Sequence, residues 1–295
     1  MTGAIVAVIV VVAVIVTLLI AIPIAYKTAI ANKEKADAQT IGTAEKLKLV
    51  CVTATGTNNL DKNYLDSRGI AWRNVAGYST ESVAQHTFAM LFYLLEKLHY
   101  YDSYVKNGHY VNDTIFTHFE EVFYELSGKT WGIIGLGNIG RRVASIAEAF
   151  KAKVIYSSPS GSAPQKGYCQ VDLDTLYRRS DIISVHAPLN QYTENLIDKT
   201  AFSNMKKSCI FLNLGRGPIV SEQDLYDALE QGDICAAGLD VLCKEPMAPD
   251  NPLLSIKDSR KLFITPHVGW ASVEARTRLM DIILGQVRDF FNPVL

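Results

Sequence analysis

The junction between an apolar run and a glycine-rich turn constrains this chain more than any other stretch. Trp131–Ile134 leads into a Gly-x-Gly-x-x-Gly turn formed by Gly135, Gly137 and Gly140, and residues 141–150 continue with helical periodicity. In such a turn the first glycine permits the sharp bend, the second lets a phosphate approach the backbone, and the third lets the helix pack on the sheet. The amides and the dipole at the helix start favour an anion. The junction therefore predicts a dinucleotide-binding site.

Composition excludes several classes of partner. The chain has 295 residues, of which 48% are hydrophobic, enough to bury one large or two medium cores. A net charge of −1 supplies no basic field for nucleic acid. The five cysteines contain no Cys-x-x-Cys pair, which argues against a zinc site and against a disulfide framework. We therefore expect no nucleic-acid partner and no metal.

The amino-terminal segment has a different character from the rest. No side chain from Met1 to Tyr26 is charged, and residues 4–25 are almost entirely Ala, Val, Ile and Leu. As a helix this run would be roughly 33 Å long, enough to cross a bilayer. It lacks the basic start of a signal peptide and the polar stripe of a soluble helix, and lysines follow it directly. We expect a single transmembrane helix within an anchor over residues 1–31, bilayer contact through residues 4–25, and a single-pass membrane location with the catalytic part facing the cytoplasm.

The remaining chain predicts an α/β fold: a doubly wound parallel Rossmann sheet with a truncated second domain. Residues 32–46 are expected to form a helical stalk or linker, residues 47–80 with 272–295 the remnant of the second domain, and residues 81–271 the dinucleotide-binding domain. Two strands are expected in the remnant. The strands expected in the large domain are Trp131–Ile134, Lys153–Tyr156, Ile182–His186, Cys209–Leu214, Ala236–Asp240 and Leu262–Thr265.

Two helices are marked by their sequence patterns. Ser82 with Gln85 is expected to form a capping box that starts a helix with an apolar face, and Val273–Phe291 is amphipathic with helical periodicity. The aromatic-rich residues 100–124 have no clear period and are expected to form a subunit-contact arm.

Three charged or titratable side chains follow the predicted strands where parallel sheets build ligand sites. They are Arg216, Glu245 and His267. An arginine can hold a carboxylate bidentately and polarise the adjacent carbonyl, and a histidine can pass a proton to its oxygen. A glutamate bonded to the imidazole favours its protonated form and fixes its orientation. The plainer alternatives are a strand cap for Arg216, a solvated turn residue for Glu245 and a structural loop histidine for His267. The other five histidines, His86, His99, His109, His118 and His186, are assigned structural roles.

These stretches, with residues 135–141, resemble the D-isomer-specific 2-hydroxyacid dehydrogenase family from about Leu47 to the carboxyl terminus. The resemblance implies that His267 is the acid/base, Glu245 its partner and Arg216 the residue for the substrate carboxylate. It implies a substrate contact through the backbone of Thr55 and Gly56. The cofactor contacts that it implies, beyond the motif glycines, are Asn138, Ile139, Ala187, Pro188, Thr193, Leu214, Gly215 and Asp240.

The substrate class and assembly also follow from resemblance. Residues 54–59 and 267–272 look most like the glycerate (hydroxypyruvate) dehydrogenase branch, and a bulky Trp270 beside the histidine suits a small 2-oxo acid such as hydroxypyruvate or glyoxylate. A homodimer is implied in the same way. Residues 4–45 resemble the membrane-anchoring start of ribonuclease Y.

The chain departs from the family pattern in two places. Ser158 stands where an acid should bind the ribose 2′-hydroxyl of NAD, and no arginine adjoins it in the sequence, which favours NAD but leaves NADP compatible with the site. The family also has about sixty residues of the substrate domain at the position where this chain has the anchor and stalk. We expect their loss to reduce turnover more than cofactor binding. The leading hypothesis is an NAD(P)-dependent oxidoreductase of small D-2-hydroxy or 2-oxo acids. The alternatives are a membrane-tethered NAD-binding or dimerising module without turnover, and a non-functional gene fusion.

Overall fold

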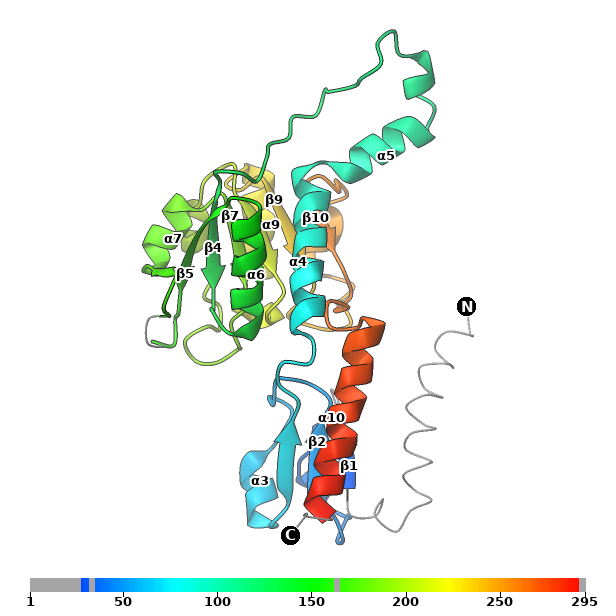
Figure 1. Cartoon of the computed structure of the whole chain (residues 1–295), viewed down its shortest axis with the longest axis vertical. Helices are drawn as coiled ribbons and strands as arrows, with labels where there is room; N and C mark the ends of the chain where they lie inside the picture. Colours follow the sequence, from blue (N-terminus) through cyan, green and yellow to red (C-terminus); the bar gives the residue numbers. More distant parts are fainter. Residues whose placement is uncertain (1–27, 32–34, 162–164, 292–295) are drawn as a thin grey trace. The chain divides into compact units, whose positions relative to one another are not determined.

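The chain forms two compact units, each with a parallel sheet of its own. The computed structural model describes residues 28–31, 35–161 and 165–291. One unit comprises Met1–Tyr78 with Val273–Leu295, and the other comprises Ser79–Ser272 (Figure 1).

The larger unit is built on a seven-stranded parallel sheet with the order β10-β9-β8-β7-β4-β5-β6. Chain order runs outward from β4 in both directions, which is the doubly wound arrangement, and the reversal falls between β4 and β7. The strands are β4 (Thr130–Ile134), β5 (Lys153–Ser157), β6 (Cys169–Gln170), β7 (Ile182–Val185), β8 (Ile210–Asn213), β9 (Ala236–Leu239) and β10 (Leu262–Ile264).

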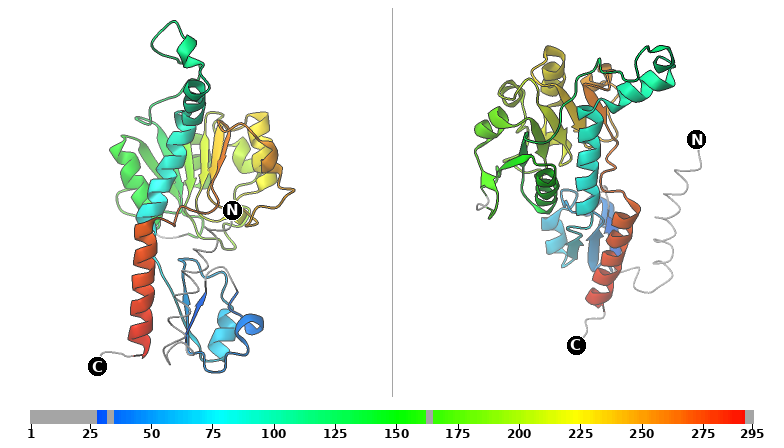
Figure 2. Two further views of the ribbon diagram at one scale, coloured as in Figure 1. Left: turned by 90° about the vertical axis from the view of Figure 1, so that its right-hand side faces the viewer. Right: turned by 45° about the horizontal axis from the view of Figure 1, so that its top comes forward.

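Helices cover both faces of this sheet (Figure 2). Side chains alternate between the faces, so that Ile210 and Leu212 join one buried cluster while Phe211 joins the other. The first cluster is covered by α4 (Thr80–Leu95) and α6 (Asn138–Ala149). The second is covered by α7 (Leu173–Arg179), α8 (Lys199–Ser203) and α9 (Glu222–Gln231). The short 3-10 turns η3 (Gly217–Ile219) and η4 (Pro252–Ser255) lie in the connections.

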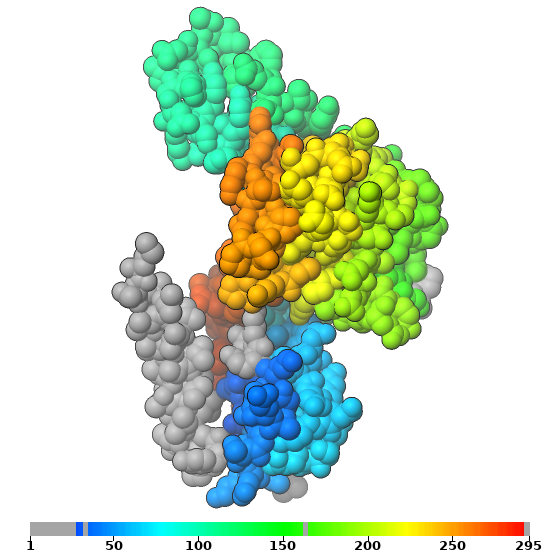
Figure 3. Space-filling model, turned by 180° about the vertical axis from the view of Figure 1, so that it is seen from behind, coloured from blue at the N-terminus to red at the C-terminus, as the bar shows by residue number. Residues whose placement is uncertain are grey.

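A segment of the larger unit projects away from its sheet. It begins with α5 (Leu98–Lys106) and η2 (Tyr110–Asn112), and extended chain returns it to β4. In the space-filling view this teal-green segment stands out from the remainder of its unit (Figure 3). We call residues 98–125 the arm.

The smaller unit has a three-stranded parallel sheet of β1 (Thr28–Ala31), β2 (Leu49–Val52) and β3 (Ala71–Asn74), with β2 central and wholly buried. The buried Leu65 of α3 (Lys62–Ser67) joins its core. The remaining helices are α2 (Ala38–Ile41) and α10 (Val273–Phe291), and the latter buries side chains at four-residue spacing.

The structure corrects three expectations for the helices and the smaller sheet. The sheet has three strands instead of two, because Thr28–Ala31 pairs with β2. Residues 35–46 form no helical stalk: only α2 is helical there, and Ala36 is buried in the core. Helix α4 begins at Thr80, so Ser82 lies inside the first turn and does not cap the helix.

The predicted membrane location is also corrected. Within residues 28–31, 35–161 and 165–291, no helix combines the length and the apolar character that a membrane crossing requires. The predicted single transmembrane helix, residues 4–25, lies outside the described residues.

The six strands predicted for the larger unit are confirmed, each within one residue at either end. β6 was not predicted, because two residues are too few to show a strand pattern. The helix predicted over Val273–Phe291 is confirmed as α10.

Asp181 links three segments of the larger unit and generates a prediction about pH. Its carboxylate accepts hydrogen bonds from the Thr130 amide at 2.8 Å and from Lys206 Nζ at 2.9 Å. Burial alone would raise the pKa of Asp181, but these two partners prevail and hold it below its usual 3.8. Because folding lowers this pKa, the contribution to stability is present above the unfolded value and is lost as the pH falls through the folded value.

We expect Asp181→Asn to lower the free energy of unfolding by about 1–3 kcal/mol near pH 7, because the charge-assisted hydrogen bonds are weakened. The difference from wild type should shrink toward zero as the pH falls below the ordinary value of 3.8 and through the lowered pKa of the folded state. Denaturant titrations across this range measure it. Asp174→Asn is the control, since its exposed carboxylate lies 3.8 Å from Arg178 and should contribute little. A difference that does not change with pH would contradict the assignment.

Candidate active site

The glycine turn lies where β4 leaves the sheet and α6 begins. Gly135 has a φ of +92°, and a Cβ there would lie 2.7 Å from the backbone of Ala187, so only glycine fits. A Cβ at Gly140 would lie 2.3 Å from the Gly135 carbonyl oxygen. At Gly137, the N-cap of α6, a Cβ would meet no atom within 4 Å. The turn therefore presents open backbone at the start of a helix, as a pyrophosphate requires.

A cavity of about 340 Å³ opens beside this turn. The glycines Gly135 and Gly137 line it. It is also lined by four of the other predicted cofactor residues, namely Ser158, Ala187, Pro188 and Thr193. The Thr193 hydroxyl donates to the Pro188 carbonyl at 2.7 Å, and this bond holds residues 188–193 in a turn.

The predicted Asn138, Ile139 and Gly140 form the first turn of α6 beside this cavity. Leu214 and Gly215 directly follow β8. The structure therefore places these five residues at the carboxyl ends of β4 and β8.

Eight of the described residues that line the cavity were missing from the predicted set: Leu136, Arg141, Tyr156, Pro159, Ser160, Gln165, His186 and Asn190. Arg141 directly follows the third motif glycine, and its guanidinium donates to Leu136 O at 3.3 Å and to Asn138 Oδ1 at 2.7 Å. The sequence did contain a signal for Arg141, because this cation lies in the first turn of a helix whose N-terminus is expected to face an anion.

His186 carries a buried polar atom that a ligand would satisfy. Trp131 Nε1 can only donate, and it donates to Ser184 Oγ at 2.8 Å, so the Ser184 proton is available to His186 Nε2 at 3.1 Å. Burial lowers the pKa of His186 to about 3, so the ring is neutral. In the tautomer whose Nε2 accepts the Ser184 proton, the ring proton is on Nδ1. Within the described residues, this Nδ1 has no hydrogen-bond partner. Together with the open glycine backbone, this donor fits a polar, anionic cofactor.

His267 and Glu245 form a close pair. Nδ1 of His267 lies 2.8 Å from Oε2 of Glu245, and both side chains are about three-quarters buried, with exposures of 24% and 22%. Glu245 Oε1 accepts the Leu242 amide at 3.0 Å, which fixes the carboxylate. The pairing at Nδ1 leaves Nε2 as the ring nitrogen that can exchange a proton with a ligand.

Arg216 lies between β8 and η3, in a loop packed against the loop of Glu245. Its carbonyl accepts from Asn213 Nδ2 at 3.0 Å, and its side chain donates to the Gly215 carbonyl at 2.7 Å. A Cβ on Gly217 would lie 1.9 Å from the carbonyl carbon of Leu242, so the two loops touch backbone to backbone. The structure thus brings the segments of two predicted catalytic residues into direct contact.

Asp240 faces the histidine loop. Its carboxylate accepts from Thr265 Oγ1 at 2.6 Å, from the Val268 amide at 2.8 Å and from the Gly269 amide at 2.9 Å. These three bonds occupy both oxygens of the residue that the resemblance assigned to the cofactor.

The residues predicted to contact substrate are divided between the two units. Trp270 belongs to the larger unit and packs against the core covered by α4 and α6. Thr55 and Gly56 belong to the smaller unit, where the Thr55 hydroxyl donates to Val75 O at 3.2 Å and its carbonyl accepts from Asn74 Nδ2 at 2.6 Å.

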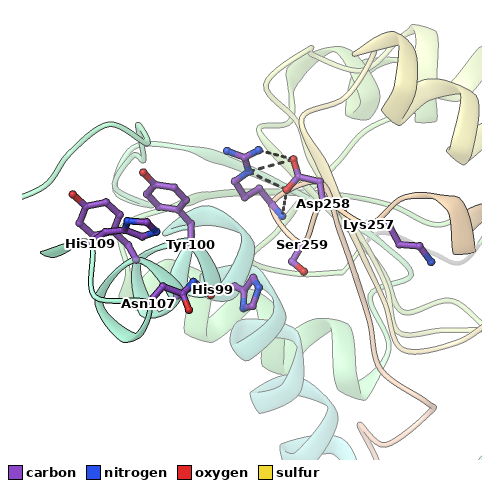
Figure 4. A pocket seen from close by; sticks show the side chains of 10 residues that line it. His99, Tyr100, Asn107, His109, Lys257, Asp258 and Ser259 are labelled. Atoms are coloured by element: carbon purple, nitrogen blue, oxygen red, sulfur yellow. Dashed lines mark hydrogen bonds and ion pairs between the residues drawn. The ribbon is translucent and has the colours of Figure 1, made fainter.

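A second cavity, of about 500 Å³, lies between the base of the arm and residues 257–260 (Figure 4). His99, Tyr100 and His109 line one side of it. The arginine on the other side, Arg260, is already paired with Asp258 at 2.9 Å and with Glu121. None of the predicted catalytic residues or motif glycines lines this cavity, so the glycine turn remains the candidate cofactor site.

Comparison with known proteins agrees with this geometry. Residues 88–269 match the family described as D-isomer specific 2-hydroxyacid dehydrogenase, NAD binding domain. A hydroxypyruvate reductase of Blautia hydrogenotrophica is 39% identical over 248 residues, which cover 83% of this chain and 76% of that protein. A glycerate dehydrogenase of Methylorubrum extorquens is 37% identical over 262 residues, covering 89% and 82% of the two chains.

A solved structure extends the match to the fold. An acyclic imino acid reductase in complex with NADPH and D-Arg superposes with a TM-score of 0.81 at 32% identity, covering 94% of this chain and 85% of that one. These comparisons give no support to the resemblance of residues 4–45 to ribonuclease Y. The chain therefore belongs to the D-isomer specific 2-hydroxyacid dehydrogenase family, and it is an NAD(P)-dependent oxidoreductase of small 2-hydroxy or 2-oxo acids.

Proposed function

We propose that this chain reduces a small 2-oxo acid of the hydroxypyruvate or glyoxylate class to the D-2-hydroxy acid, and that Arg216, Glu245 and His267 carry the reaction. The observation that carries the proposal is the 2.8 Å contact between His267 and Glu245, on a loop at the carboxyl edge of the sheet that binds the cofactor. The relatives named hydroxypyruvate reductase and glycerate dehydrogenase support the substrate class.

Arg216 is proposed to hold the substrate carboxylate. A guanidinium can bind a carboxylate bidentately and polarise the neighbouring carbonyl, which orients C2 and draws charge toward its oxygen. The backbone of Thr55 and Gly56 is proposed to bind the same carboxylate, and Trp270 to limit the size of the substrate.

His267 is proposed to give its Nε2 proton to the carbonyl oxygen as that oxygen gains charge, and to take the proton back in the reverse direction. Glu245 holds Nδ1 and stabilises the imidazolium that exists before transfer. The bound nicotinamide supplies the hydride to C2. One hydride and one proton thus convert the carbonyl group at C2 to the alcohol.

We propose Ser79–Ser272 as the dinucleotide-binding domain and the smaller unit as the substrate domain. The division into two compact units supports this assignment. The proposed cofactor contacts are Gly135, Gly137, Asn138, Ile139, Gly140, Ser158, Ala187, Pro188, Thr193, Leu214, Gly215 and Asp240.

Glu245→Gln tests the proposed pair. The amide keeps the shape of the side chain but loses the charge that supports the imidazolium, so kcat for 2-oxo acid reduction should fall roughly 10- to 100-fold. The dissociation constant for NADH should stay within about twofold of the wild-type value, because Glu245 is not among the proposed cofactor contacts.

Stopped-flow reduction and NADH fluorescence titration measure the two quantities. Glu230→Gln is the matched control. The Glu230 carboxylate is half-exposed and pairs with Lys261 at 3.6 Å, so this substitution should leave kcat unchanged. An unchanged kcat in Glu245→Gln would remove this residue from the proposed chemistry.

The cavity lining supports NADP(H) as well as NAD(H). Ser158 stands where a carboxylate would repel a 2′-phosphate, and the described residues that line the cavity include neither Asp nor Glu. Arg141 adds a positive charge to the same lining, and no carboxylate of the described residues forms an ion pair with it. The sequence favoured NAD because no arginine adjoins Ser158, but the structure brings one to this cavity from α6.

Arg141→Ala should weaken NADPH binding about 10-fold and NADH binding by less than about twofold, because the guanidinium attracts the extra phosphate. Titration with each reduced cofactor gives both dissociation constants. Arg142→Ala is the control, because that neighbouring arginine pairs with Glu81 at 2.8 Å and does not line the cavity. Equal losses for both cofactors would contradict a role at the 2′-position.

We propose that the arm joins two copies of the chain. Its exposed apolar side chains would be costly in water, with Phe116 90%, Val111 84% and Phe119 70% exposed. A second copy is the proposed cover, because two identical apolar arms can bury each other around a twofold axis.

Sedimentation should therefore show a dimer for the wild type and a monomer for the double variant Phe116→Glu and Phe119→Glu. The two glutamates would be buried in the interface without cationic partners, which destabilises the dimer. Tyr192→Glu, at a 57% exposed position outside the arm, should stay dimeric. A dimeric arm variant would contradict this interface.

A further inference from the structure

The loop that carries His267 adopts a backbone that its own sequence does not favour. His267 has a φ of 55°, in the left-handed region that non-glycine residues rarely occupy. Such a conformation costs free energy and persists only where the surroundings impose it. The contacts of the loop should therefore identify what holds the histidine in place.

One anchor of the loop is Asp240, at the end of β9. It receives the Thr265 hydroxyl and the amides of Val268 and Gly269, on both sides of the histidine. Burial would raise the pKa of Asp240, but the bonds from His86, Thr265 and these two amides outweigh it and keep the pKa below its ordinary value. The ionised carboxylate is thus an acceptor for the loop.

The second anchor comes from α4. Ser82 and His86 are four residues apart and share one face of this helix. The Ser82 hydroxyl donates to the Gly269 carbonyl at 2.6 Å, and His86 Nε2 lies 2.9 Å from Thr265 Oγ1. Both contacts lie within the larger unit.

The direction of the His86 bond follows from its partners. The Thr265 hydroxyl donates its only proton to Asp240, so its oxygen must accept the proton of His86 Nε2. His86 Nε2 also lies 3.5 Å from Asp240 Oδ1. A Cβ on Gly269 would lie 2.8 Å from Asp240 Oδ2 and 3.3 Å from the His86 ring, so the loop is packed tightly between the two anchors.

We propose that His86 is a positioning residue for the reaction. With Ser82 it forms a clamp on α4 that holds residues 265–269 against Asp240 and so aims His267 at the substrate. His86 acts through Thr265, which its Nε2 contacts at 2.9 Å. The inference rests on the proposed role of His267, and it gives function to a histidine for which the sequence indicated only a structural role.

The test compares His86→Leu with His86→Gln. Leucine fills the space without a donor, whereas glutamine retains an N–H group of similar reach. In His86→Leu we expect kcat to fall roughly 10-fold or more with the NADH dissociation constant within about twofold, and in His86→Gln we expect most of kcat to return. Thr87→Val is the matched control: it lies on the same helix and removes only a bond to the Val83 carbonyl.

A second readout does not depend on turnover. Hydrogen exchange of the Val268 and Gly269 amides should accelerate roughly 10-fold or more in His86→Leu and stay at the wild-type rate in Thr87→Val. The clamp is overturned if exchange of these amides is unchanged, or if glutamine fails to restore both kcat and protection. Wild-type protein without turnover would instead count against the proposed function, while the exchange comparison would still decide the clamp.

Discussion

The contact between Gly135 and the backbone of Ala187 is the constraint on which the site depends. β4 and β7 are neighbours in the sheet. The strands β5 and β6 lie on one side of β4, whereas β7 and the strands that follow it lie on the other side, so the strand order reverses between β4 and β7. A crevice for a dinucleotide forms only at such a reversal. At this point the two chains approach so closely that a Cβ on Gly135 would collide with Ala187 at 2.7 Å. The same sheet edge then receives the loops that carry Arg216, Glu245 and His267.

Each of these loops is held by a bond to another segment, so the site is organised before a ligand arrives. The Glu245 loop packs on Gly217, beside Arg216, and its Cys243 amide donates to Glu222 of α9 at 2.7 Å. The His267 loop is held by Asp240 and α4. Charged groups held in advance lower the reorganisation that a transition state demands. This arrangement favours an enzyme over a cofactor-binding module without turnover.

The sequence predicted the features that depend on local pattern and missed those that depend on tertiary contact. Short apolar runs located six strands, and the residues that follow three of them placed the proposed catalytic loops at one edge of the sheet. The sequence pattern places Thr28–Ala31 in the expected anchor, because a four-residue strand beside a long apolar run has no pattern of its own. Ser82 resembled a helix cap, but its partner is Gly269, 187 positions away in the sequence. The role proposed for His86 depends on Thr265, a neighbour 179 positions away that only folding brings to it.

The most direct test of the account is oxidation of NADH and NADPH by the full-length chain with hydroxypyruvate, glyoxylate and pyruvate, beside an Arg216→Ala control. We expect consumption of both cofactors, fastest with hydroxypyruvate or glyoxylate, and a loss of kcat/KM of roughly 100-fold or more in the control, since the substrate carboxylate loses its partner. Consumption with none of the three acids, or turnover that Arg216→Ala leaves intact, would contradict the proposed chemistry.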